Sequence, residues 1–370
     1  MDQDLTIDKG TCFSIFSYDI GAGINLDLAE QQVVSTTERI RIQRKRAEPQ
    51  YFDYRPPPLR VIQEVTPIHI SQWSTSPQVE IVLYDFGAVS VFFRFSLQGG
   101  FRSFQLLSEA LFENALLLKE SQTLVQQVVG TISNAIEKCN ISPFIEDYTI
   151  WHIEKFSPNL SPQILQQTYS QDMAQLLRSE DETLSPEEVQ DSNSCHISFG
   201  IHDLTIIDWN GAVIFGTEMA DVVAVLEFSN VQLLERRYLD QQLDDALDEA
   251  YEALTRKAGV QFLWPGFFKA DLRRIAQLQV DGAILFERVT NALKLVGDQY
   301  LARVYRLTSK RFHLEGWDAS ILRKLETIED IYDKLSDQTG NQRMEVLEWI
   351  IIILIALSIL LPFIPGFPGY

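Results

Sequence analysis

The sequence predicts an α+β protein. We expect a mixed α/β head, followed by a stalk of long helices resembling a coiled coil and by one C-terminal transmembrane helix. Three observations predict this. Short apolar runs that are typical of strands, with two helical patterns between them, fill the chain up to residue 225. After residue 226, apolar residues recur at the three- and four-residue spacing of helices. The chain then ends in an uncharged apolar block, Trp349–Phe367.

The composition excludes several classes of protein. The chain has 51 acidic residues against 31 Lys and Arg, which gives a formal net charge of −20. A protein that coats DNA is excluded, because phosphates repel such a surface. Three cysteines, Cys12, Cys139 and Cys195, are too few for a disulfide scaffold or a four-thiolate metal site. The acidic N-terminus does not have the pattern of a secretion signal, so we expect the chain in a reducing cytoplasm.

The chain is expected to divide into four segments. These are an N-terminal extension (residues 1–75), an α+β head (76–225), a long-helix stalk (226–345) and a transmembrane anchor (346–367). The extension contains a strand at Thr11–Tyr18 and a basic run, Arg39–Arg46, with five cations in eight residues. Such a run can contact anionic lipid or RNA, but it is more often an exposed loop without a partner.

The elements of the head follow from apolar periodicity and turn signals. Strands are expected at Val79–Tyr84, Ala88–Phe95, Tyr148–Phe156, Cys195–Gly200, Leu204–Asp208 and Ala212–Phe215. The dipeptide Asn210-Gly211 predicts a hairpin between the last two strands. Helices are expected at Leu106–Lys138 and Gln163–Leu177, and an acidic polar loop at Ser179–Ser194.

Three long helices are expected to form the stalk. Residues Ser229–Gln232 have the spacing of a capping box, so the first helix is expected to begin there and to end near Lys257. The second is expected at Lys269–Phe312. The third begins near Asp318 and is expected to continue through Gly340 into the apolar end.

Two sets of charges in the stalk are candidates for an interaction. One is an acidic stripe at four-residue spacing, Asp240, Asp244, Asp248 and Glu252. The other is a basic face on the second helix, Arg303, Arg306 and Lys310. Like charges four residues apart destabilise a helix, so the stripe favours a cationic partner within the chain or in another subunit. A solvated face and a divalent-cation site are the alternatives.

The C-terminal block is expected to be a membrane anchor. Its nineteen uncharged residues would rise about 28 Å as a helix, although Pro362 and Pro365 shorten the regular part. Arg343 lies on the N-terminal side of the block, so the positive-inside rule favours an orientation with the N-terminal bulk of the chain in the cytoplasm. The alternatives are a buried core helix and a contact between subunits. The expected anchor residues are Trp349, Ile350, Ile353, Leu354, Leu357 and Leu361.

No catalytic or cofactor-binding residues are expected. The chain has no P-loop, nucleophile elbow, HExxH motif or paired CxxC motif. Gly21-Ala22-Gly23 and Asp85-Phe86-Gly87 match a dinucleotide fingerprint and a kinase tripeptide only in part, so both are interpreted as turns. One cluster, His196, His202, Asp203 and Asp208, has the residue types of a transition-metal site. The favoured interpretation is a set of polar residues at the edge of a hairpin, with a metal site as the alternative, so no metal-binding residues are expected.

The stalk and the apolar end resemble a known family. The sequence from Leu226 to Asp240, the helix Trp317–Asp337 and the block Arg343–Ile355 (RMEVLEWIIIILI) carry the resemblance. They are similar to the "required for meiotic nuclear division" family, also called the sporulation or Sif/YagE-type family, over residues 200–361. The strand Asp85–Phe93 is similar to a strand of the same family. The resemblance implies a non-enzymatic, oligomeric membrane protein that supports translation of membrane-bound proteins.

The leading functional hypothesis is therefore a membrane-anchored, non-enzymatic scaffold without a cofactor. The expected partners are membrane lipid, a second copy of the chain through the stalk, and a protein or ribosomal partner that the sequence does not specify. The expected location is the cytoplasmic face of a bacterial inner membrane, or the matrix face of the mitochondrial inner membrane. The alternatives are a divalent-cation transporter resembling magnesium channels and a metal-dependent enzyme of the head.

Overall fold

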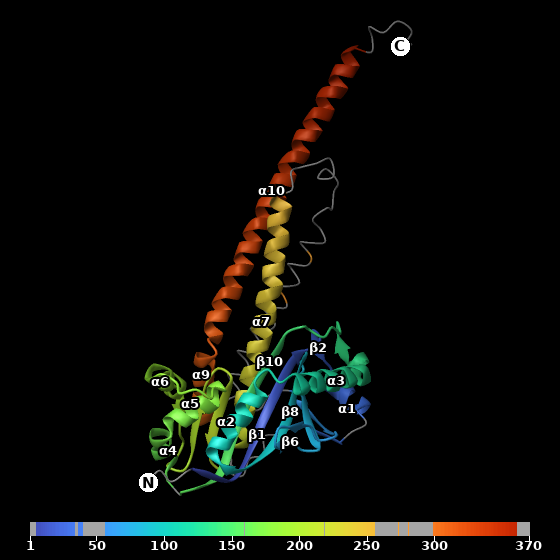
Figure 1. The fold of residues 1–370 in the computed structure, drawn as a ribbon. Helices are drawn as coiled ribbons and strands as arrows, with labels where there is room; N and C mark the ends of the chain where they lie inside the picture. Colours follow the sequence, from blue (N-terminus) through green and yellow to red (C-terminus); the bar gives the residue numbers. More distant parts are fainter. Residues whose placement is uncertain are drawn as a thin grey trace. The chain divides into compact units, whose positions relative to one another are not determined.

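The computed structural model describes residues 5–33, 36–39, 56–158, 160–217, 219–255, 273, 280 and 299–360 (Figure 1). The chain divides into two compact units. Unit 1 contains Met1–Tyr238 and Ile284–Asp318, and unit 2 contains Leu239–Ala283 and Ala319–Tyr370. Two long helices, α7 (Ala220–Thr255) and α10 (Leu314–Leu360), contribute residues to both units.

Unit 1 is built around a nine-stranded sheet. Its strands are β1 (Thr6–Asp19), β3 (Thr36–Arg39), β4 (Leu59–Glu64), β7 (Gln78–Leu83), β8 (Ala88–Gly100), β10 (Ile145–Ser157), β11 (His196–Ile197), β12 (Leu204–Ile207) and β13 (Gly211–Phe215). Their order is β11-β12-β13-β10-β1-β8-β7-β4-β3. Neighbours are antiparallel except β10 and β13, which are parallel. Two small sheets pair β2 (Gly23–Ile24) with β9 (Ile136–Glu137), and β5 (His69–Ile70) with β6 (Trp73–Ser74).

Most of the predicted strands are confirmed. β1 and β10 extend the predicted strands at both ends, and β7 and β8 form the predicted pair around residues 85–87. β12 and β13 form the hairpin that Asn210-Gly211 predicts. β11 is only two residues long, because the chain after Ile197 leaves the sheet for a loop. The mixed α/β class of the head is therefore confirmed.

Both faces of the sheet are buried, which gives unit 1 three layers. Successive side chains of a strand point to opposite faces. On β8, Phe93 accordingly belongs to one core and Phe92 to the other. The first core is completed by α2 (Phe101–Leu111), α3 (Ala115–Ile132) and α5 (Ser170–Arg178), and the second by α7 and α9 (Gln299–Arg311). Figure 1 also shows the short helices α1 (Leu26–Gln32), α4 (Pro162–Thr168) and α6 (Pro186–Ser194).

The single helix predicted at Leu106–Lys138 is wrong, because the chain forms two helices there. α2 ends at Leu111, and Glu113 adopts a left-handed conformation with φ of 48°. The side chain of Asn114 then caps α3, because its Oδ1 accepts hydrogen bonds from the backbone N–H groups of Leu116 and Leu117 at 3.1 and 3.0 Å. The helical spacing of apolar residues continues across this break, so periodicity alone does not reveal it.

Replacing Asn114 by Ala is expected to destabilise unit 1 by about 1 kcal/mol, because two backbone N–H groups of α3 lose their acceptor. The shift of the urea unfolding midpoint measures it. Thr123→Ala is the matched control, since its hydroxyl donates only to the carbonyl of Lys119 in the same helix. The control is expected to change stability by less than about 0.5 kcal/mol. Equal midpoints for the two variants would contradict the cap.

The acidic loop predicted at Ser179–Ser194 is wrong in its second half, where α6 forms. Ser185 accepts a hydrogen bond from the backbone N–H of Glu188 at 3.3 Å, and Pro186 occupies the first turn. Both are start signals of a helix. The low hydrophobicity of the segment conceals them. The helix predicted at Gln163–Leu177 is likewise divided, at Tyr169, into α4 and α5.

The predicted start of the first stalk helix is also wrong. α7 begins at Ala220, and Ser229 lies inside it. The hydroxyl of Ser229 donates to the carbonyl of Val225 at 2.8 Å and caps nothing. The cause is the apolar run before it, where Val222, Val225 and Leu226 have helical spacing and are buried against the sheet.

In unit 2, α7 and α10 each contribute a buried apolar stripe. The buried residues are Leu239, Leu243 and Ala246 of α7, and Ile321, Ile328 and Ile331 of α10. The helices α7 and α10 therefore supply the apolar residues of a helical pair. α10 continues through Gly340 without interruption, as predicted. Of the predicted helix Lys269–Phe312, the structure describes α9 and two isolated residues; the remainder lies outside the described residues.

The transmembrane anchor expected at Trp349–Phe367 is not supported by the described residues. α10 ends at Leu360, so the described part of the apolar run is residues 349–360. Twelve helical residues rise about 18 Å, against roughly 30 Å of bilayer hydrocarbon. Among the helices of the described chain, none has an apolar stretch long enough to cross a membrane. Leu361, and the basic run after Arg39, lie outside the described residues.

Candidate functional site

The four residues that have the types of a transition-metal site do not converge, so the metal alternative gains no support from the described residues. A ring nitrogen of His196 lies 2.8 Å from the carbonyl oxygen of Asn193, and His202 is exposed. The carboxylate of Asp203 accepts hydrogen bonds from the backbone N–H groups of Phe199 and Gly200. Asp208 is fully buried and faces arginine. Within the described ranges, no group of three or more His, Cys, Asp or Glu side chains is arranged to hold a metal ion.

Asp208 is instead the centre of a buried ion cluster. Arg311 of α9 donates to Asp208 through its Nε at 2.9 Å, and Arg178 of α5 lies 2.7 Å away. The hydroxyl of Ser192 donates to the same carboxylate at 2.9 Å. Arg311 also donates to Asp191 at 2.7 and 3.1 Å. The cluster therefore joins α5, α6 and α9 to the end of β12.

Two members of this cluster, Arg311 and Asp191, have pKa values shifted in the direction that favours their charged forms. Burial alone would lower the pKa of Arg311, but its hydrogen bonds to Asp191 and Asp208 raise the pKa above its ordinary value. The hydrogen bond from Arg311 lowers the pKa of Asp191. Both carboxylates of the cluster face a guanidinium group. The role of the cluster is to position the helices.

A second set of buried charges lies between the sheet and the first part of α7. Glu227 of α7 is buried in the second core, where it accepts a hydrogen bond from the hydroxyl of Tyr84. Burial raises the pKa of Glu227 to about 7, against the opposing effects of Tyr84, Ser90 and Arg60. Repulsion from the like charge of Glu80 also raises the pKa of Glu227.

Two further carboxyl groups share this layer. Burial raises the pKa of Asp19 to about 7, and a hydrogen bond with Glu235 of α7 opposes part of the shift. Burial also raises the pKa of Glu146 to about 7, although it forms an ion pair with Arg237 of α7. Together with Glu227 these groups form the carboxyl layer: three side chains under α7 that change protonation near neutral pH. The three carboxyl groups therefore lie at the interface between α7 and the sheet, and not in an open cleft.

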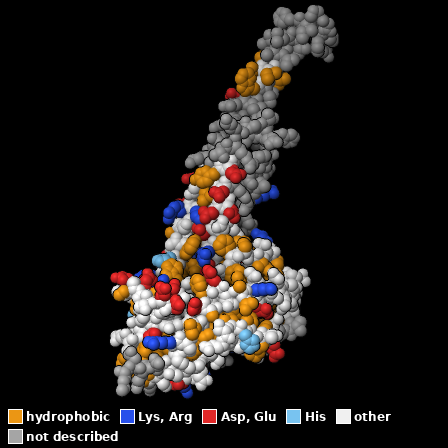
Figure 2. Space-filling model, viewed as in Figure 1, with side chains coloured by type: hydrophobic (Ala, Val, Ile, Leu, Met, Phe, Trp, Pro, Cys, Tyr) orange, Lys and Arg blue, Asp and Glu red, His pale blue; other side chains and the backbone are white. Residues whose placement is uncertain are grey.

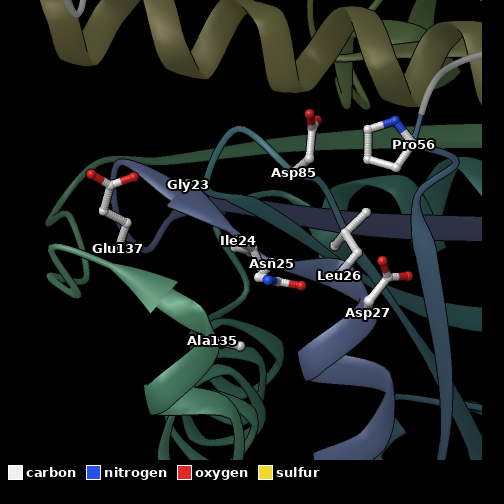
Figure 3. Close-up of a pocket in the computed structure, with 9 residues that line it drawn as sticks. All are labelled: Gly23, Ile24, Asn25, Leu26, Asp27, Pro56, Asp85, Ala135 and Glu137. Carbon is white, nitrogen blue, oxygen red and sulfur yellow. The ribbon is translucent and has the colours of Figure 1, made fainter.

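A cavity of about 410 Å³ lies where β2 passes into α1 (Figure 3). Gly23, Ile24 and Asn25 line it together with Ala135. The carboxylates of Asp27, Asp85 and Glu137 are spread around it and do not meet at one point (Figure 3). Within the described ranges, these carboxylates therefore do not form a metal site.

The two glycine motifs beside this cavity have a packing role. A Cβ atom on Gly87 would lie 1.7 Å from the carbonyl oxygen of Gly21, and Gly87 has φ of 103°. The backbone N–H of Ile20 donates to Gly87 at 2.9 Å, and that of Ile24 donates to Asp85 at 2.7 Å. The two turns therefore cross at backbone contact, which only glycine permits. This accounts for both motifs without a nucleotide.

The acidic stripe meets a cation other than the predicted ones. The Nζ atom of Lys324 in α10 lies 2.8 Å from Asp240 and 2.6 Å from Asp244. Burial alone would lower the pKa of Lys324, but hydrogen bonds to both aspartates raise it. Asp248 and Glu252 are exposed. The predicted partners Arg303, Arg306 and Lys310 are exposed on α9, in unit 1.

The apolar end of α10 is exposed along its described length. Trp349 is 64% exposed, and residues 351–355 are each more than half exposed. Figure 2 shows the described part of this segment as a group of hydrophobic side chains. Of the other expected anchor residues, Ile353 and Leu354 belong to this exposed group. The structure does not describe the side chains of Ile350 and Leu357.

Taken together, unit 1 is a three-layer α/β protein with a large, mainly antiparallel sheet and charges buried under its helices. A family described as the N-terminal domain of the uncharacterized protein MJ0711 matches residues 9–221. That is more than half of the chain, and the chain belongs to this family. The uncharacterized protein MJ0711 of Methanocaldococcus jannaschii is 26% identical over 247 residues, which cover 64% of this chain and 72% of the relative. No solved structure matches. These comparisons do not confirm the resemblance to the meiotic nuclear division family.

Proposed function

We propose that the protein is a non-enzymatic scaffold that is attached to a lipid bilayer by the apolar end of α10. The observation that carries the proposal is the exposure of Trp349 and of residues 351–354, all apolar. Successive helical residues are rotated by 100°, so these side chains surround the helix on every side. A second helix would cover one stripe of such a surface, whereas lipid covers all of it.

The remaining features of units 1 and 2 support a scaffold and not a catalyst. The buried charges of unit 1 are paired or placed under helices, and the carboxylates around the cavity near Gly23 do not converge in the described residues. The α7–α10 pair of unit 2 provides a surface for a second copy of the chain. The resemblance over residues 200–361 extends the proposal to the support of translation or of membrane-protein biogenesis, with the bulk of the chain in the cytoplasm.

Flotation of the full chain with neutral phosphatidylcholine vesicles tests the attachment. The wild-type chain is expected to float with the vesicles. A variant with Ile351→Asp and Leu354→Asp is expected to partition at least a hundredfold less, because each carboxylate at depth costs about 3 kcal/mol. The matched control is Leu106→Asp with Leu116→Asp, two exposed apolar positions of unit 1. It is expected to float as the wild type does.

Two outcomes would overturn the proposal. One is that the Asp variant at 351 and 354 floats as well as the wild type. The other is that neither chain floats while the wild type self-associates in a way that the variant abolishes. The second outcome would assign the apolar end to a contact between copies of the chain.

A further inference from the structure

An exposed apolar loop joins β11 to β12 in unit 1. Phe199 is 77% exposed and Ile201 is 71% exposed. The loop is nevertheless held in one conformation, because Asp203 accepts hydrogen bonds from the backbone N–H groups of Phe199 at 2.7 Å and Gly200 at 2.6 Å. Two large apolar side chains two residues apart are therefore presented to solvent from one hydrogen-bonded loop.

This loop is continuous with the exposed face of α9. The ring of Phe199 packs edge-on against Tyr300, with the ring centroids 5.4 Å apart. The guanidinium carbon of Arg303 lies 5.8 Å from the centroid of the same Tyr300 ring. Phe199 and Arg303 thus contact one aromatic ring from two elements. We name the exposed residues Phe199, Ile201, Arg303, Arg306 and Lys310 the loop–α9 surface.

The three cations of this surface have the opposite sign to the net charge of the chain, and the acidic side chain of Asp203 in the same loop accepts hydrogen bonds from the loop backbone. Arg303, Arg306 and Lys310 are spaced by three and four residues, so they share one helix face, and all three are exposed. α9 contains no Asp or Glu. Among the described residues, none of the three cations has a carboxylate within 4.0 Å, whereas Arg311 on the buried face is paired with Asp191 and Asp208.

We propose that the loop–α9 surface binds an anionic lipid bilayer. Phe199 and Ile201 would enter the boundary between headgroups and acyl chains, and the three cations would meet the phosphates. Each cation near an anionic surface strengthens binding by about fivefold. The net charge of −20 does not prevent this, since charges farther away than about 8–10 Å are screened at physiological salt.

The inference goes beyond the proposed function, because it concerns unit 1 and the charge of the lipid. Insertion of the α10 end depends on apolar surface and is measured with neutral vesicles. Binding through the loop–α9 surface appears as the additional affinity for vesicles that contain phosphatidylglycerol. The proposed attachment through α10 and the proposed binding through the loop–α9 surface can therefore be contradicted independently in the same flotation assay.

The test is flotation of the full chain with phosphatidylglycerol-containing and pure phosphatidylcholine vesicles. The wild type is expected to bind the anionic vesicles more tightly. The triple variant Arg303→Gln, Arg306→Gln, Lys310→Gln is expected to lose roughly a hundredfold of that affinity, and to bind neutral vesicles as the wild type does. Phe199→Ser with Ile201→Ser is expected to lower anionic binding by at least about tenfold.

The matched control carries the same charge change at exposed positions elsewhere in unit 1, Lys119→Gln, Lys138→Gln and Lys155→Gln. It is expected to keep most of the additional affinity. The proposal is overturned if the control loses as much as the α9 triple variant, or if phosphatidylglycerol adds no affinity to the wild type. It is also overturned if the surface instead drives a salt-sensitive association between protein chains that the triple variant abolishes.

Discussion

Replacing Arg311 by Met is expected to destabilise unit 1 by about 3 kcal/mol or more. Arg311 is one of two guanidinium groups that face Asp208, so its removal leaves a fully buried carboxylate only partly compensated, and this costs more than the pair itself contributes. Asp208 has no exposed surface, and after the change only Arg178 and Ser192 face its side chain from other elements. Asp191 also loses its two hydrogen bonds from Arg311.

Urea unfolding of the full chain, followed by tryptophan fluorescence, measures this effect. Trp151 lies in the core of unit 1 and reports on it. Arg306→Met is the matched control on the same helix, at an exposed position, and is expected to change stability by less than about 0.5 kcal/mol. If Arg311→Met unfolds at the urea concentration of this control, the cluster does not hold α9 in place.

Replacing Glu227 by Gln is expected to stabilise unit 1 at pH 8 by about 2 kcal/mol. The pKa of Glu227 is raised from 4.5 to about 7 in the folded chain. Between these two pKa values the folded state binds more protons at Glu227 than the unfolded state does. The contribution of Glu227 to stability is therefore fully present below pH 4.5 and is lost as pH rises through 7. The full shift corresponds to about 3 kcal/mol above pH 7.

Glutamine has no charge to desolvate, and it retains an oxygen for the hydroxyl of Tyr84. The difference in stability between the variant and the wild type is therefore expected to be large at pH 8 and small at pH 5. Unfolding midpoints across this range measure it. Asp19 and Glu146 are present in both proteins, so their contributions to the pH dependence of stability cancel in the difference. An equal change from Glu109→Gln, at an exposed position of α2, or a difference that does not vary with pH, would argue against a buried ionised Glu227.

Local signals in the sequence predict those parts of the fold that depend on neighbouring residues. Asn210-Gly211 fixes the β12–β13 hairpin because the turn needs only its own residues. The parallel pairing of β10 with β13 is not predictable in this way, since the two strands are far apart in the chain. Ser185 and Pro186 do signal α6, but the apolar period that normally supports a helix is missing there.

The buried charges were predictable only in part. The sequence places Asp208 near two histidines, but it gives no sign of its partner Arg311, which lies 103 positions later. The cation that meets Asp240 is Lys324, 84 positions away. Glu227 does carry a sequence signal, a carboxyl group inside the apolar run of residues 222–228. Because its partners come from other strands, its raised pKa could be inferred only from the folded chain.

The most direct test of the membrane attachment is quenching of Trp349 by brominated lipid. Six tryptophans contribute to the fluorescence of the chain, so the signal of Trp349 is obtained as the difference between the wild type and Trp349→Phe. With neutral vesicles that carry bromine on the acyl chains, the wild type is expected to show a quenched component that Trp349→Phe lacks. Equal quenching of the two proteins, or none in either, would contradict attachment of the protein through the apolar end of α10.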